Sequence, residues 1–74
     1  MTLKDAHEGD KIRVVKVNST GSIRQRMMDM GIINGAEINV ERYAPLRDPI
    51  HIKVKGYSLA LRVSEGGMIE VEPI

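Results

Sequence analysis

The chain has 74 residues, no cysteine, two tyrosines as its only aromatic residues, and a formal net charge of +1. A chain of this length buries only about 60% of its unfolded surface, so we expect a single domain spanning residues 1–74 around one aliphatic core. The absence of cysteine excludes disulfides and thiolate metal sites. The shortage of aromatic rings argues against a base-stacking platform and against a groove for proline-rich peptides.

The charge is unevenly distributed along the chain. Residues 11–62 carry ten Lys or Arg against four Asp or Glu, whereas residues 1–10 and 63–74 are net acidic. No apolar run approaches the about 20 residues that a transmembrane helix needs, and residues 1–5 lack the apolar centre of a signal peptide. We therefore expect a cytoplasmic protein that does not insert into the membrane.

The first elements in chain order are a strand and a short helix. Residues 3–10 form a lead-in with a turn at 8–10, and the β-branched run at 11–17 predicts a strand. Residues 22–31 change period and predict a helix whose core face carries Ile23, Met27 and Met30. Ser22 and Gln25 suit a capping box at its start.

The sequence also predicts where this helix ends. Gly31 is a natural left-handed stop, and the following Ile32 can touch Met27, as in a Schellman ending. The dipeptide Asn34-Gly35 then predicts a turn.

The rest of the chain predicts short strands. Apolar residues alternate with polar ones in residues 37–41, and again in a hairpin over residues 50–63 that turns at 55–57. Gly66-Gly67 marks another turn, before a last strand over residues 68–72 with Ile69 and Val71 inward. About five strands and one helix, inserted between the first two strands, predict a mainly β, SH3-like, partly open barrel.

The order and spacing of these features resemble the FeoA family, small SH3-like proteins associated with bacterial and archaeal ferrous iron uptake. The Arg-Met-Met-Asp-Met-Gly-Ile run at 26–32 looks like the family's Arg-Leu-x-x-Leu-Gly-Leu helix end, with methionine in place of leucine. Asn34-Gly35 stands where the family usually has Pro-Gly. The proline-bracketed Ala-Pro-Leu-Arg-Asp-Pro-Ile run at 44–50 is the most specific segment.

The resemblance implies an accessory or regulatory protein that contacts FeoB, the membrane ferrous iron permease, on its cytoplasmic side. It implies protein–protein contact rather than catalysis, and no cofactor. The residues agree, since the chain offers no nucleophile paired with a base and no phosphate-binding glycine motif.

Metal ligation is weighed separately because the family is linked to iron. The candidate ligands are His7, Glu8 and Asp10, with His51 and Glu65 able in principle to join them. None has a second ligand at helical or strand spacing, and His51 falls on the solvent-facing side of its strand. We interpret these residues as solvated surface and expect no metal site.

The expected partner-binding residues are Arg24, Met28, Leu46 and Arg47. Met28 lies off the predicted core face of the helix, beside Arg24, and an exposed methionine is an adaptable contact. The alternative is that Met28 closes one mouth of the barrel. Leu46 and Arg47 lie in a loop stiffened by prolines, where the alternative is that Leu46 folds back on the barrel.

Two other functions stay open at this point. The basic middle segment would suit a small nucleic-acid-binding barrel, although the missing aromatic rings and the near-neutral net charge disfavour it. A metal-sensing SH3-like module related to iron-dependent repressors would instead use His7 or His51. A weak homo-oligomer is left open.

Overall fold

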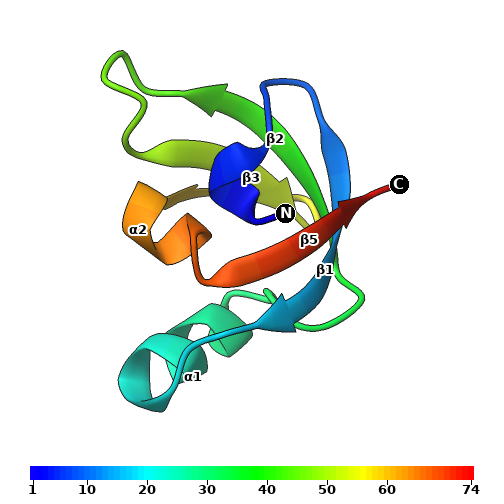
Figure 1. Cartoon of the computed structure of the whole chain (residues 1–74), viewed down its shortest axis with the longest axis vertical. Helices are drawn as coiled ribbons and strands as arrows, with labels where there is room; N and C mark the ends of the chain where they lie inside the picture. Colours follow the sequence, from blue (N-terminus) through cyan, green and yellow to red (C-terminus); the bar gives the residue numbers. More distant parts are fainter.

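Five antiparallel strands form one sheet in the computed structural model, which describes residues 1–74 (Figure 1). The strands are β1 (Lys11–Val17), β2 (Glu37–Tyr43), β3 (Ile50–Val54), β4 (Tyr57–Leu61) and β5 (Ile69–Pro73). Their order across the sheet is β4-β3-β2-β1-β5, so β4 and β5 are edges and the barrel is not closed. The prediction of a partly open, five-stranded SH3-like barrel is confirmed.

Three short helical segments complete the chain: the 3₁₀ turn η1 (Leu3–Asp5), α1 (Gly21–Asp29) and α2 (Val63–Gly66). The helix α1 connects β1 to β2, as predicted. None of these segments has the length and apolar character needed to cross a membrane. In η1, the Asp5 carboxylate accepts hydrogen bonds from the backbone N–H of Thr2 at 3.0 Å and from its hydroxyl at 3.1 Å. Both bonds lower the pKa of Asp5, and the bond from the backbone N–H has the larger effect.

The core is wholly apolar, with no buried polar or charged side chain. The alternation predicted within β2, β3 and β5 is confirmed, because the residues predicted to face inward are buried; in β4, Leu61 is buried and Leu59 is partly buried. The sixteen residues of the core are Leu3, Ala6, Ile12, Val14, Val17, Met27, Ile32, Ala36, Ile38, Val40, Ile50, Ile52, Val54, Leu61, Ile69 and Val71.

Two irregularities bend the sheet around this core. The pairing of β1 with β5 shifts between Val14 and Lys16, and the pairing of β2 with β3 shifts between Val40 and Arg42. An extra residue in one strand increases its local twist and bends it. In β1 the extra residue is Val15, whose side chain is 47% exposed.

The helix α1 differs from the prediction at its start. It begins at Gly21 after Thr20, so Ser22 lies within the first turn and makes no capping box. Gln25 instead donates a hydrogen bond to Asp29, at 2.9 Å. Ile23, predicted for the core face, is 39% exposed, because α1 projects beyond the sheet and only its last turn reaches the core (Figure 1).

The end of α1 follows the prediction. Gly31 adopts φ 89°, its N–H donates to the carbonyl of Met28 at 3.0 Å, and the N–H of Ile32 donates to the carbonyl of Met27 at 2.9 Å. These are the two bonds of a Schellman motif. Met27 and Ile32 are both fully buried, and Met30 is partly buried against the same core.

The segment after β4 also differs from the prediction. The alternation in 59–63 placed Val63 in the strand, but β4 ends at Leu61 and Val63 begins α2. The backbone N–H of Val63 donates to the Asp48 carboxylate at 3.1 Å, and that of Arg62 donates to Glu65 at 3.0 Å. Both bonds turn the chain out of the sheet.

Tyr43, at the end of β2, fastens the N-terminal segment to the sheet. Its hydroxyl donates a hydrogen bond to the carbonyl of Ala6, a residue that is itself buried. Burial, the largest influence, raises the pKa of Tyr43 above its ordinary value of about 10. The neutral phenol is therefore the form that the fold favours.

We expect Gly31→Ala to destabilise the fold by about 1–2 kcal/mol, because a residue with a Cβ is strained at positive φ. An added Cβ would lie 3.5 Å from the nearest side-chain atom of Lys55, so the cost is in the backbone rather than in packing. Urea denaturation measures the change. The matched control is Gly67→Ala, since Gly67 has φ −67°; an equal loss in both variants would contradict the assignment.

Tyr43→Phe should lower the free energy of unfolding by about 1 kcal/mol at neutral pH, because the Ala6 carbonyl loses its donor. Since the folded-state pKa of Tyr43 is raised, the stabilisation is fully present below pH 10 and is lost as the pH rises through the folded-state pKa. The difference in stability between wild type and Tyr43→Phe should therefore shrink in alkaline solution. Denaturation curves collected between neutral and alkaline pH would test this, and a constant difference would contradict it.

Candidate functional site

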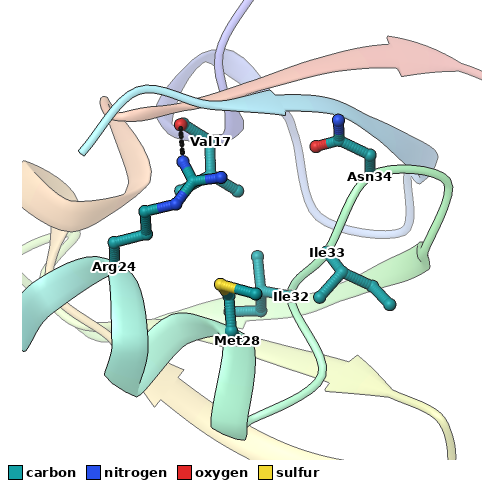
Figure 2. A pocket seen from close by; sticks show the side chains of 6 residues that line it. All are labelled: Val17, Arg24, Met28, Ile32, Ile33 and Asn34. Carbon is teal, nitrogen blue, oxygen red and sulfur yellow. Dashed lines mark hydrogen bonds between the residues drawn. The ribbon is translucent and has the colours of Figure 1, made fainter. Parts of the chain in front are cut away.

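An open pocket of about 230 Å³ lies between α1 and the end of β1, and we call it the α1 pocket (Figure 2). Its lining residues are Val17, Arg24, Met28, Ile32, Ile33 and Asn34. Met28 is 44% exposed and Ile33 is 39% exposed, so both apolar side chains are within reach of a partner.

Arg24 is held in place at this pocket. Its Nη1 donates to the backbone carbonyl of Val17 at 3.0 Å, a contact drawn as the dashed line in Figure 2. The guanidinium has further N–H donors beyond the one used here. The α1 pocket thus combines apolar walls with a positioned cation.

The Schellman ending of α1 builds the wall of the pocket opposite the helix. After Gly31 the chain turns back towards β1, where the N–H of Gly35 donates to the carbonyl of Val14 at 2.7 Å. Ile32 then points into the core and Ile33 points out. Met27 is the methionine that is fully buried, whereas Met28, one residue further round the helix, remains partly exposed.

A second exposed feature is the loop of residues 44–49 between β2 and β3, which we call the β2–β3 loop. A turn closes it, with the N–H of Arg47 donating to the carbonyl of Ala44 at 2.7 Å. Leu46 is 91% exposed at the tip and does not fold back on the barrel. The Arg47 guanidinium carbon lies 4.6 Å from the centre of the Tyr43 ring, a cation–π contact that orients the side chain.

The four residues expected to bind a partner therefore form two surfaces rather than one. Arg24 and Met28 belong to α1, which lies at the lower end of the molecule in Figure 1, whereas Leu46 and Arg47 belong to the β2–β3 loop, which lies at the upper end. The longest dimension of the molecule is 30 Å, along the vertical of that view. Sequence reasoning missed Ile33, although its position directly after the predicted core residue Ile32 is a signal that it faces outward.

The candidate metal ligands are dispersed. His7 and Asp10 lie together, with Nδ1 3.9 Å from a carboxylate oxygen that also accepts the backbone N–H of His7 at 2.8 Å. Glu65 forms an ion pair with Arg26, and His51 lies on β3. No group of three or more His, Cys, Asp or Glu side chains comes together.

Comparisons with known proteins agree on one family. The FeoA domain model matches residues 1–73. The chain is 39% identical over 74 residues to a Porphyromonas gingivalis protein that fuses Fe(2+) transport protein A to the Fe(2+) transporter FeoB. This match covers the whole chain but only 9% of the fusion protein.

Solved structures give the same result. Iron(II) transport protein A from Clostridium thermocellum superposes with a TM-score of 0.96 at 32% identity, over 100% of this chain and 46% of that one. FeoA from Stenotrophomonas maltophilia, solved in complex with zinc, gives 0.85 at 25% identity, over 97% of this chain and 89% of that one. The latter is described as an SH3 domain protein and a candidate ferrous iron transport activating factor. By its sequence and its fold, the chain belongs to the FeoA family, which is associated with ferrous iron transport.

Proposed function

We propose that this domain is an accessory or regulatory component of ferrous iron uptake that acts by direct contact with the cytoplasmic side of FeoB. The observation that carries the proposal is the Porphyromonas gingivalis fusion, in which a homologue of the whole chain is covalently joined to FeoB. Fusion converts a bimolecular contact into an intramolecular one at an effective concentration of about millimolar for a short flexible linker. Within the fusion, a contact of modest affinity is therefore sufficient.

The α1 pocket supports this proposal as a surface for a mixed apolar and acidic contact. The unbranched Met28 side chain adapts its shape to an apolar partner group. Arg24, already oriented by its bond to Val17, keeps N–H donors for a carboxylate on the partner. Holding the guanidinium in place before binding reduces the entropy that association would cost.

The β2–β3 loop supports it as a second surface. An exposed leucine that becomes fully buried in a partner contributes about 1.5–3 kcal/mol. Leu46 has that exposure, and the loop that carries it is closed by its own hydrogen bonds. Arg47 is oriented by its stacking on Tyr43. The partner could use either surface alone or reach both.

We expect Met28→Asp and Leu46→Asp each to weaken binding to FeoB by about ten- to a hundredfold, because each replaces a buried apolar contact with a carboxylate. Binding is measured by titrating purified full-length FeoB with the chain. The matched control is Ile74→Asp, because Ile74 is 56% exposed and lies in neither surface.

The outcomes separate the function from its location. If only one of the two variants loses affinity, the contact uses that surface alone. Undiminished binding by a variant that carries both Met28→Asp and Leu46→Asp would show that both assigned surfaces are wrong. Failure of the wild-type chain to bind FeoB would contradict the proposed function itself.

A further inference from the structure

The two edges of the open sheet are protected very differently. The β5 edge is covered by the N-terminal residues, because the N–H of Val71 donates to the carbonyl of Met1 at 2.9 Å and Thr2 forms a bridge with Glu70. The same strand carries Glu70, Glu72 and Pro73. Charge, proline and a covering segment are the usual means by which proteins prevent an edge strand from pairing.

The β4 edge has none of these features. Its sequence, Tyr-Ser-Leu-Ala-Leu, is the only one among the five strands without a charged residue, and it has no proline. Its first four residues are exposed or only partly buried. No bulge interrupts its pairing with β3.

The backbone of β4 presents free hydrogen-bonding groups outward. A two-residue turn, Lys55-Gly56, joins β3 to β4, with positive φ at both residues, so Val54 and Tyr57 form the closing hydrogen-bonded pair. Hydrogen-bonded and non-bonded pairs alternate along an antiparallel ladder. Ser58 and Ala60 therefore direct their N–H and C=O groups away from β3, and no turn, loop or cap hydrogen bond reaches them.

The surroundings of this edge carry more basic than acidic side chains: Glu41 lies beside Arg42 in the open pocket that reaches Ser58, and Asp48 lies beside Arg62 in the one that reaches Ala60. Residues 49–64 include Lys53, Lys55 and Arg62 and contain no Asp or Glu. Lys53 pairs with Ser58 across the ladder and His51 pairs with Ala60, so both basic side chains share the face of the β4 residues whose backbone is free.

We propose that the β4 edge is a strand-addition site for an extended segment of the partner that bears carboxylates. The segment would pair with the free backbone groups of Ser58 and Ala60, while its acidic side chains lie beside Lys53 and the ends of the strand. This proposal rests on the proposed function, since FeoB is the protein that supplies the segment. In such binding the main chain supplies affinity and alternate side chains supply specificity.

A second copy of the chain fits the β4 edge less well than an acidic segment. In a two-fold antiparallel pair centred on Leu59, Arg62 of each copy would lie near Lys55 of the other. Like charges placed together across a ladder are destabilising. A partner with carboxylates at these positions turns the same contacts into attractions.

The β4 edge also continues into the β2–β3 loop. Ala60 and Arg62 line an open pocket together with Asp48 and Pro49 of that loop. A strand added to β4 would therefore end beside the loop that carries Leu46. One partner segment could fill the edge and contact the loop together.

The test compares Ala60→Pro with the matched control Ala60→Val in titrations of full-length FeoB. Proline is tolerated at an edge position whose N–H faces solvent, but it removes the donor that strand addition needs. We expect Ala60→Pro to weaken binding about tenfold and Ala60→Val to leave it near the wild-type value. Lys53→Glu should also weaken binding, since it repels an acidic segment.

Amide exchange on the wild-type chain tests the same proposal without a substitution. The N–H groups of Ser58 and Ala60 should exchange rapidly in the free chain and at least about tenfold more slowly when FeoB is bound. Slow exchange already present in the free chain, together with a dimer in sedimentation, would assign the edge to a second copy and overturn the proposal.

Each remaining outcome has a distinct meaning. Undiminished binding by Ala60→Pro, with these amides unprotected in the complex, overturns the strand-addition site and leaves the proposed function standing. Undiminished binding by Lys53→Glu overturns the acidic character of the segment. No binding by the wild-type chain overturns both this inference and the proposed function.

Discussion

The left-handed turn at Gly31 is the constraint on which the lower half of the molecule depends. It ends α1, directs Ile32 into the core and returns the chain to β1 through the bond between Gly35 and Val14. Met27 then closes the aliphatic core from below, while its neighbour Met28 and the residue after Ile32 are left outside. One backbone conformation thus produces both the packing of the helix and the apolar rim of the α1 pocket.

The core itself offers the protein little chemistry. It is made of aliphatic side chains and methionine, with no buried polar group. The features that distinguish this domain therefore lie on its outside: an anchored arginine beside exposed apolar groups, a leucine raised on a closed loop, and a sheet edge without charge. Each of these features suits the partner contact proposed above, and a relative of the chain is fused to the Fe(2+) transporter FeoB.

The sequence predicted most of the fold because apolar and polar residues alternate along β3, β5 and the first part of β2. Ile50, Ile52 and Val54 face the core as their spacing requires. Prediction from the sequence failed where a contact with a distant part of the chain decides the local structure. Val63 continues the alternation of β4, but the Asp48 carboxylate, fifteen positions earlier, binds its N–H and turns it into α2. Ile23 has helical spacing with Met27, yet the sheet is too short to cover the first turn of α1, which no local pattern reveals. Arg24, Met28, Leu46 and Arg47 could each be recognised as exposed, but their separation into two surfaces depends on the tertiary fold.

The short helix α2 lies between α1 and the β2–β3 loop (Figure 1), and side-chain contacts join it to each of them. Glu65 pairs with Arg26 of α1 and also accepts the N–H of Arg62, next to the residue held by Asp48 of the β2–β3 loop. Glu65, which lies in neither the α1 pocket nor the β2–β3 loop, therefore joins α1 to the first turn of α2. Removing its carboxylate would delete the ion pair to α1 and the acceptor at the start of α2 in a single step.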